Sequence, residues 1–468
     1  MANVDFGRYK KIVQFFWDPA PMNDATSKSP IWCLGKEYRP SDKPSAPNTA
    51  AAPSSPPGAE PIEPEQDAKP ATPPDSAASS FDSGLAYDEA RNADDDGGWP
   101  PSFLDDFEAR IWLTYRSNFP AIPKSRDPSA LSAMSLAVRI RSQLVDQGGF
   151  TSDTGWGCMI RSGQSLLANS LVMLRMGRGQ SVEHKESSRI NVLTDWRRGS
   201  SSDEERKILS LFADDPKAPY SIHKFVEHGA TACGKHPGEW FGPSATARCI
   251  QALTNSHEPP ELRVYITGDG SDVYEDTFMS IAKPDGSTFK PTLILVGTRL
   301  GLDKVTPVYW EALKTSLQMP QSIGIAGLVP IRKDLNKSTD TSSGQPSSSH
   351  YFIGVQGPHF FYLDPHQTRP ALPLPEKLEG YTQEDIDSCH TRRLRRIHVK
   401  EMDPSMLIAF LIRDENDWKD WRQAVQEVQG KAVIHVADQD PAGLGLGGER
   451  HGAIDEVETF DDEDDDTM

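Results

Sequence analysis

The sequence predicts a fold that mixes helices and strands, and three local patterns carry that prediction. After Cys158, apolar residues recur at spacings of three and four, the period of a helix with one buried face. Pro243 begins a second helical pattern, because proline is favoured in the first turn of a helix. Residues 351–355 and 360–363 are mostly β-branched or aromatic and flank a Gly-Pro pair, which predicts two strands joined by a turn.

The first helix matters because Cys158 lies where a glycine-rich loop becomes helical. In a first turn, unpaired N–H groups and the positive end of the helix dipole favour the thiolate, which is the attacking form of cysteine. Gly155 and Gly157 allow close approach of the backbone on both sides of the thiol. Taken alone, such a cysteine is more often a small buried packing residue.

The second predicted strand ends in Asp364-Pro365-His366. In an extended chain, residues two apart point to the same side, and proline restricts its own φ, so the carboxylate and the imidazole are expected to be neighbours. A carboxylate in this position selects the histidine tautomer and stabilises imidazolium, and the imidazole then takes a proton from a thiol. For these three residues alone, a surface histidine after a strand-end turn is the alternative.

These motifs resemble those of the autophagy-specific cysteine proteases of peptidase clan CA, and the chain is similar to fungal-type members of that family. Residues 151–158 resemble the nucleophile motif of the family, and residues 362–366 resemble its acid and base motif, in the same order. The resemblance covers most of residues 30–38 and 100–435. Further similar segments are residues 30–35, 112–120, 239–243, 319–322 and 403–406.

The resemblance implies an α+β fold, with a papain-like cysteine protease core and a small accessory subdomain. It also implies a substrate, the ubiquitin-like autophagy modifier, which the family cleaves after a C-terminal glycine. That cleavage matures the modifier precursor and releases the modifier from phosphatidylethanolamine. In this interpretation Cys158 is the nucleophile, His366 the general base and Asp364 the group that orients His366.

Three further residues are candidates for the same site. The developing oxyanion needs hydrogen-bond donors, and the backbone N–H of Cys158 at the helix start is a natural one. The resemblance adds the hydroxyl of Tyr115 as a second donor, whereas the sequence alone favours a packed aromatic there. By resemblance, Trp240 and the loop around Pro346 cover the groove for the glycine end of the substrate; a half-buried aromatic at a helix entry is the alternative for Trp240.

We expect four segments along the 468 residues. Residues 1–38 form an N-terminal segment with a core-associated strand. Residues 39–98 are rich in Pro, Ser and Ala with almost no large apolar side chain, which predicts a disordered insert. The protease domain is expected at residues 99–435, and residues 436–468 are expected to be a disordered acidic tail.

The charge balance argues against nucleic acid as a partner. The net charge is −19, and the last 14 residues contribute nine acidic side chains and no base, so the body of the protein is moderately acidic. The one basic run, residues 392–400, alternates at its end like a strand with a solvated face. Attraction to an acidic partner surface or to anionic lipid is the alternative for this run.

The five cysteines are spaced too irregularly for a disulfide framework or a metal knuckle, so we expect no metal and no cofactor. An odd count suits a reducing compartment. The N-terminus lacks the features of a secretory signal, and the longest apolar candidate for a membrane span, residues 406–412, is far too short. We therefore expect a cytoplasmic monomer, with the nucleus and the site of autophagosome formation as further locations, which meets a membrane through its lipidated substrate.

One loop departs from the family pattern. Relatives have two adjacent glycines before the segment that leads to Pro346, whereas here Gly327 and Gly344 are separated by residues 328–343. We expect these sixteen residues to form a flexible polar loop. Our hypothesis is a gene-model artefact such as a retained intron, because removing them restores the glycine pair.

Two other function classes stay open at this point. A thiol acyltransferase would use the same Cys, His and Asp chemistry, and spacing alone does not separate it from a protease. An inactive modifier-binding protein is the non-enzyme alternative. The pattern Tyr9-Lys10-Lys11-Ile12 has the form by which the family binds the surface of the modifier, although one amphipathic turn explains it equally well.

Overall fold

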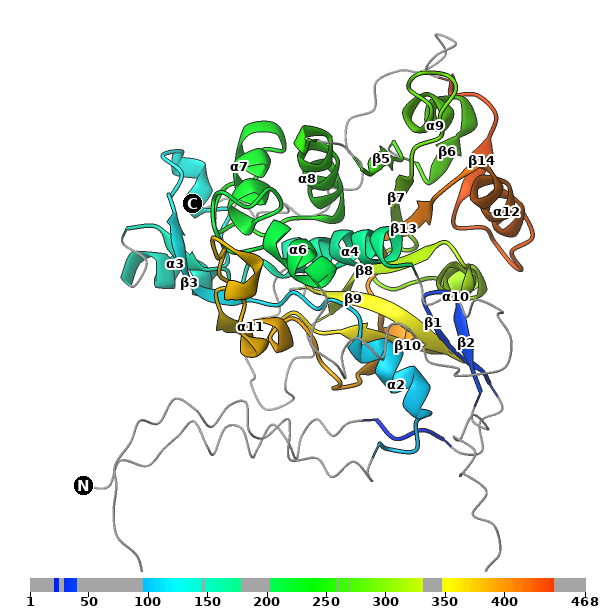
Figure 1. Ribbon diagram of the computed structural model, residues 1–468, viewed down its shortest axis with the longest axis horizontal. Coiled ribbons are helices and arrows are strands. Elements are labelled where there is room, and N and C mark those ends of the chain that lie inside the picture. Colours follow the sequence, from blue (N-terminus) through cyan, green and yellow to red (C-terminus); the bar gives the residue numbers. More distant parts are fainter. Residues whose placement is uncertain are drawn as a thin grey trace, which may run out of the picture.

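The computed structural model describes residues 21–24, 29–39, 96–144, 148–177, 203–258, 261–268, 270–330 and 347–441. Within these ranges the fold is α+β, as predicted: a central mixed sheet is packed against helices that come from several parts of the chain (Figure 1). This is the arrangement expected of a papain-like protease core.

Nine strands of the described chain form the central sheet. They are β1 (Ile31–Cys33), β2 (Lys36–Tyr38), β5 (Arg263–Ile266), β7 (Thr292–Arg299), β8 (Ser322–Pro330), β9 (Ser347–Gln356), β10 (His359–Leu363), β12 (Arg396–His398) and β13 (Ser405–Ile412). Seven strands follow the order β12-β10-β9-β8-β13-β7-β5, and the β1–β2 hairpin is added through β1 to β9. Neighbours are antiparallel, except for the parallel pair β5–β7.

Two smaller sheets and the helices complete the described fold. One small sheet joins β3 (Arg116–Ile122), β4 (Phe150–Ser152) and β11 (Arg369–Pro370), and the other pairs β6 (Asp272–Tyr274) with β14 (His435–Ala437). The helices are α2 (Pro101–Glu108), α3 (Leu136–Leu144), α4 (Cys158–Arg175), α6 (Asp203–Leu211), α7 (Ile222–Ala232), α8 (Pro243–Ser256), α9 (Glu275–Ala282), α10 (Trp310–Gln318), α11 (Gln383–Asp387) and α12 (Glu415–Gln426). Short 3-10 turns occur at Pro128–Leu131, Pro307–Tyr309, Leu378–Gly380 and Val399–Glu401.

The predicted hairpin is present as β9 and β10. Gly357 in its turn has φ of +52°, a left-handed conformation that glycine adopts without strain. The pairing starts at Gln356 and His359, and a bulge between Phe361 and Tyr362 shifts the register by one residue. The hairpin therefore ends in a register that turn geometry alone does not specify.

Helix α4 begins at Cys158, as predicted, with Gly157 as its N-cap residue. The prediction of one buried face was wrong, because buried side chains surround this helix along most of its length. Figure 1 shows the reason: α4 lies between strands β8 and β9 on one side and helices α6, α7 and α8 on the other, and it contacts all five elements. At Gly163, an added Cβ would lie 2.4 Å from Cγ2 of Thr246, so glycine lets α8 approach α4 closely.

Because α4 is enclosed, its polar side chains find partners inside the protein. Asn169 binds both the N–H and the carbonyl of Ile111, at 3.0 and 2.9 Å, and the hydroxyl of Ser165 accepts from the N–H of Leu113 at 2.9 Å. Buried polar groups without such partners would be costly. Side chains of α4 thus bind the backbone of residues 111–113 through hydrogen bonds, as a neighbouring strand would.

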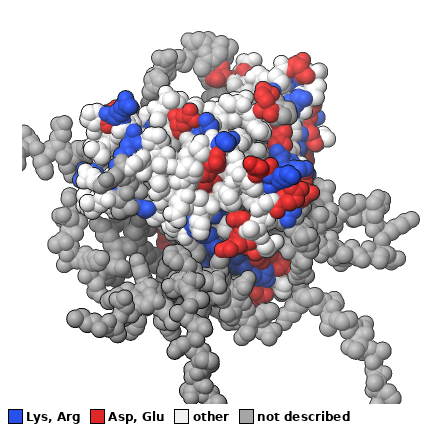
Figure 2. Space-filling view, turned by 60° about the vertical axis from the view of Figure 1, so that its left-hand side comes forward, with Lys and Arg blue, Asp and Glu red and all other residues white. Residues whose placement is uncertain are grey.

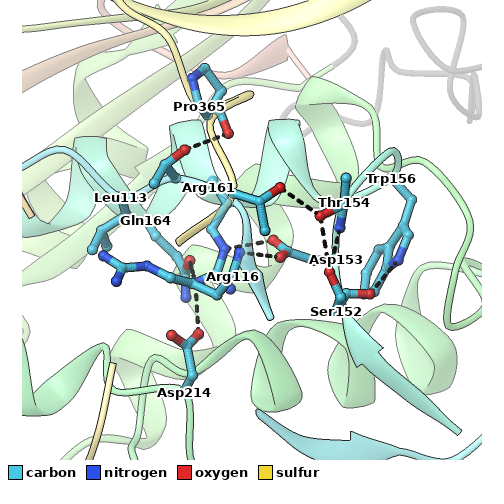
Figure 3. A network of polar contacts seen from close by, with 12 residues as sticks. Leu113, Arg116, Ser152, Asp153, Thr154, Trp156, Arg161, Gln164, Asp214 and Pro365 are labelled. Carbon is cyan, nitrogen blue, oxygen red and sulfur yellow. Dashed lines mark hydrogen bonds and ion pairs between the residues drawn. The ribbon is translucent and has the colours of Figure 1, made fainter. Parts of the chain in front are cut away.

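A buried ion network surrounds the first turn of α4 (Figure 3). Arg161 is fully buried and lies between two carboxylates, 2.7 Å from Asp153 and 2.8 Å from Asp214. Asp153 also accepts from the backbone N–H of Arg116 at 2.6 Å, and Asp214 accepts from the N–H of Leu372 at 2.8 Å. Burial by itself lowers the pKa of Arg161. The two carboxylates raise this pKa by more than burial lowers it, so the guanidinium stays charged. The charge of Arg161 therefore links α4 and the loop before it to the segments that contain Arg116, Asp214 and Leu372.

Three boundaries differ from those expected from the sequence. Residues 328–330 form the end of β8, paired to β9, and Leu328 is buried, so this part of the expected polar loop is a strand. Residues 96–98 form an ordered turn before α2, although they were expected in the disordered insert. Residues 436–437, expected in the acidic tail, belong to β14, which pairs in parallel with β6.

Several expectations fall outside the described residues. These are the loop at Pro346, the short pattern at residues 9–12, most of the insert at residues 39–98, residues 331–343 of the departing loop, and the tail beyond residue 441. Among the helices within the described ranges, none has both the length and the apolar character to cross a bilayer. On the face presented in Figure 2, basic and acidic side chains are interspersed.

Replacing Asp153 with Asn should lower the free energy of unfolding by about 3 kcal/mol, because the buried charge of Arg161 loses one of its two carboxylates. Urea denaturation of the full chain measures this change. Asp203→Asn is the matched control, since the side chain of Asp203 is 76% exposed and its ion pair with Arg206 lies at the surface. Equal destabilisation by the two substitutions would contradict a central role for the network.

Candidate functional site

The carboxylate and the imidazole after β10 lie together, as their spacing predicts. Nδ1 of His366 is 2.6 Å from Oδ1 of Asp364, and the same oxygen accepts from the backbone N–H of His366 at 3.0 Å. Burial by itself raises the pKa of Asp364 and lowers that of His366, but their mutual hydrogen bond and the charges of the neighbouring groups together outweigh burial at both. The pKa of Asp364 is held far below its ordinary value, and that of His366 is raised to about 10.

A strap of residues 112–115 holds the backbone of this loop. The indole N–H of Trp112 donates to the carbonyl of Asp364 at 2.8 Å. The carbonyl of Pro365 accepts from the N–H of Tyr115 at 2.9 Å and from the hydroxyl of Thr114 at 2.7 Å. Because α4 also holds residues 111–113, the strap connects the helix of the candidate nucleophile to the loop of the candidate base.

Cys158 faces this loop from the first turn of α4, and its residue is only 4% exposed. At Gly157, an added Cβ would lie 2.5 Å from Oδ2 of Asp153, so glycine is required for the carboxylate to fold under the turn. Burial by itself raises the pKa of the Cys158 thiol, but the neighbouring imidazole of His366, together with Ser349 and Trp240, lowers it by more. The net pKa lies below its ordinary value of 9.0.

Two of the remaining predicted residues adjoin the thiol. The ring of Tyr115 meets the ring of His366 edge to face at 5.3 Å, and its hydroxyl interacts with Cys158. Burial first, and then the charge of Cys158, raise the pKa of Tyr115 far above its ordinary value, so the hydroxyl keeps its proton. The indole of Trp240 helps to lower the pKa of Cys158 and therefore lies beside the thiol. Pro346 lies outside the described residues.

His350 in β9 belongs to the same cluster, and sequence reasoning missed it. Its Nε2 is 3.7 Å from Oδ1 of Asp364, its Nδ1 is 3.1 Å from the carbonyl of Ser348, and its ring is 5.0 Å from that of His366. Burial lowers the pKa of His350 to about 4, so this imidazole is neutral at pH 7. The bulge in β10 contributes to the miss: unshifted pairing from Gln356 and His359 would set Phe352, rather than Tyr351, opposite Leu363, the residue before Asp364.

Donor atoms of His350, Asp364 and His366 lie within 4.8 Å of one another, which is close enough for the three side chains to bind a metal ion together. The short hydrogen bond between Asp364 and His366 already occupies two of these atoms. The expectation that the protein uses no metal stays a prediction.

The arrangement is suited to nucleophilic chemistry. The lowered pKa of Cys158 and the raised pKa of His366 favour a thiolate beside an imidazolium at neutral pH. The thiolate can attack an electrophilic carbon, and the imidazolium can supply a proton to a leaving group. Backbone N–H groups at the start of α4 and the protonated hydroxyl of Tyr115 can donate hydrogen bonds to a developing negative charge.

Comparison with known proteins gives a family for the chain. The model of the peptidase C54 catalytic domain matches residues 100–424, which include Cys158, Asp364 and His366. The chain is 71% identical over 468 residues to a probable cysteine protease atg4 of Sclerotinia sclerotiorum, covering all of this chain and 99% of the relative.

More distant relatives cover the chain equally well. A cysteine protease ATG4 of Gibberella zeae is 56% identical over 100% of this chain and 98% of its own length. Cysteine protease 1 of Neurospora crassa is 50% identical over 97% of this chain and 90% of its own length. A family model that spans more than half of the chain and relatives that align along nearly its whole length agree: the chain belongs to the peptidase C54 family, the autophagy-specific cysteine proteases.

Proposed function

We propose that this protease cleaves after the C-terminal glycine of the ubiquitin-like autophagy modifier, both to mature its precursor and to release it from phosphatidylethanolamine. The observation that carries the proposal is the convergence of Cys158, His366 and Asp364, with pKa shifts that favour a thiolate and an imidazolium. The names of the relatives, which are cysteine proteases called ATG4, support the autophagy modifier as the substrate.

In the proposed mechanism, Sγ of Cys158 attacks the carbonyl carbon of the terminal glycine of the modifier. The backbone N–H of Cys158 and the hydroxyl of Tyr115 donate to the oxyanion. The C–N bond then breaks, a thioester remains on Cys158, and the imidazolium of His366 protonates the departing amine. Water, activated by the neutral imidazole, hydrolyses the thioester and restores the thiol. Asp364 keeps His366 oriented throughout.

The amine that leaves differs between the two proposed reactions, but the acyl half is the same. It is a peptide amine in maturation and the amine of phosphatidylethanolamine in release. Trp240, beside the thiol, is proposed to narrow the groove so that glycine enters and larger residues do not, together with the loop at Pro346. The four-segment organisation, with residues 96–98 and 436–437 reassigned to the protease domain, remains part of the proposal. The monomeric state and a location in the cytoplasm, the nucleus and sites of autophagosome formation remain part of it as well.

Incubation with modifier that carries a C-terminal extension tests the proposal. The extension should be removed by the full chain, and Cys158→Ser should lower the rate at least about a thousandfold, because the thiolate is lost. Mass spectrometry of the product identifies the last residue. Cys233→Ser is the matched control, because Cys233 lies at the C-terminal end of α7, outside the cluster.

The same experiment separates the alternative functions. An acyltransferase would join the modifier to an added amine in preference to water, and an inactive binding protein would leave the extension intact. Cleavage that survives Cys158→Ser would refute the proposed nucleophile. Modifier conjugated to phosphatidylethanolamine in vesicles extends the test to release from lipid.

The rate on a soluble substrate should depend on pH in a bell shape. Activity rises as Cys158 loses its proton, below the ordinary thiol pKa of 9.0, and falls as His366 loses its proton near pH 10. In Asp364→Asn the alkaline limb should move to lower pH, because the carboxylate that raises the pKa of His366 is gone. An alkaline limb that stays near pH 10 in this variant would contradict the role of Asp364.

His350 is proposed to be a positioning residue that shields the hydrogen bond between Asp364 and His366 from water. His350→Ala should lower kcat by about tenfold with little change in KM, and should move the alkaline limb to lower pH, because a solvated bond raises the pKa of His366 less. His350→Phe keeps a ring in the same space and is expected to restore most of both properties. If the phenylalanine variant behaved like the alanine variant, shielding would be the wrong explanation.

A further inference from the structure

The basic run noted in the sequence lines a cavity of about 380 Å³ at the β10 and β12 edge of the central sheet. Six of the lining side chains are basic or imidazole groups: His359, Arg393, Arg395, Arg396, His398 and Lys400. We call this cavity the basic groove. Its volume lies within the range of about 300–1,000 Å³ that is typical of small-ligand sites.

The lining of the basic groove carries more basic than acidic side chains, and Asp24, which does not line it, partly offsets the charge of Arg396. Glu401 is the one acidic residue among the residues that line it. Arg392, at the start of the run, differs from its neighbours: its guanidinium binds Asp105 at 2.8 Å and Glu108 at 3.0 Å, and it does not line the groove. Residues 392–400 therefore comprise one arginine that forms ion pairs with α2, Arg392, and several basic side chains that line the basic groove.

Titration behaviour agrees with a positive potential in the groove. The pKa of His359 is lowered first by burial and then by the charges of Arg396 and His398. Burial also lowers the pKa of Arg395. An anion that entered the groove would reverse both effects, because a negative charge favours the protonated forms.

The basic groove adjoins the catalytic cluster. Tyr362 lines the groove, and its ring meets that of His350 edge to face at 4.6 Å, while His350 in turn lies 5.0 Å from His366. Two ring contacts thus separate the groove from the candidate general base. A group bound in the groove would lie beside the active site without entering it.

We propose that the basic groove binds the phosphate of an anionic phospholipid headgroup. Guanidinium groups suit phosphate oxygens, since they present paired donors, and lysine adds a point charge. The apolar side chains of Leu394 and Ile397 also line the groove and can cover the carbon atoms next to the phosphate. A lipid is favoured over other anions because the proposed substrate is conjugated to phosphatidylethanolamine, so this inference rests on the proposed function.

Vesicle sedimentation with the full chain tests this inference without any modifier present. Vesicles of phosphatidylcholine with phosphatidylserine should bind the protein, and vesicles of phosphatidylcholine alone should not. Binding should weaken as salt is added, because the contact is between charges. The double variant Arg393→Gln/Lys400→Gln should lose roughly tenfold in partition onto the anionic vesicles, since each base near an anionic surface contributes to binding.

The matched control is Lys217→Gln/Lys290→Gln, which removes the same charge from exposed lysines outside the groove and should bind like the wild type. Loss in the groove variant alone supports the inference. Equal binding by both variants, or binding that does not depend on phosphatidylserine, overturns it. Inorganic phosphate and an acidic peptide are titrated separately by calorimetry. If either binds through the groove while anionic vesicles do not bind, the lipid assignment is wrong.

Activity measurements keep this inference distinct from the proposed function. The groove variant should cleave soluble extended modifier at the wild-type rate, because Arg393 and Lys400 are not in the catalytic cluster. Its release of modifier from vesicles that contain phosphatidylserine should be several-fold slower than that of the control variant. Failure of vesicle binding with intact cleavage would reject the groove alone, whereas failure of cleavage by the wild type would reject the proposed function.

Discussion

The buried charge of Arg161 is the interaction on which the rest of the site depends. A guanidinium with no exposed surface is tolerated only with its counter-charges in place, and these come from the loop before α4 and from the segment after α6. Each carboxylate also binds a backbone N–H of another segment, at Arg116 and at Leu372. The first turn of α4, which begins at Cys158, is therefore held by ion pairs and hydrogen bonds that all depend on the charge of Arg161.

The second half of the site is fixed in a different way. The loop after β10 has little regular structure of its own, and the strap of residues 112–115 holds its carbonyl groups through hydrogen bonds. The strap in turn is held by Asn169 and Ser165 on α4. Cys158 and His366, the proposed nucleophile and base, thus share one support, although they are about two hundred residues apart in sequence.

The surroundings of the Cys158 thiol differ in character from the neighbouring basic groove. Cys158 is buried, and the rings of Tyr115 and Trp240 lie beside it. The basic groove next to it presents charge at the edge of the sheet, and His350 and Tyr362 lie between the two regions. The proposed release of modifier from lipid would use both regions, the thiol for the scissile bond and the basic groove for the lipid surface.

The sequence alone determined the local chemistry, because that chemistry depends on residues close together in the chain. The helix start at Cys158, the hairpin of β9 and β10, and the proximity of Asp364 to His366 all follow from short-range spacing, and all are present. Family resemblance extended this to Tyr115 and Trp240, which do lie beside the thiol. The division of residues 392–400 into a structural Arg392 and a set of groove bases was not visible in the sequence, because it depends on contacts with α2.

Only the tertiary structure decided how these pieces meet. Burial of α4 along most of its length depends on helices and strands from distant parts of the chain, so the periodicity of its own apolar residues predicted only one buried face. The place of His350 depends on one bulge in β10, which shifts the pairing by a single residue and sets Tyr351, rather than Phe352, opposite Leu363. Long-range packing and strand register are properties of the whole sheet, and spacing along one segment does not encode them.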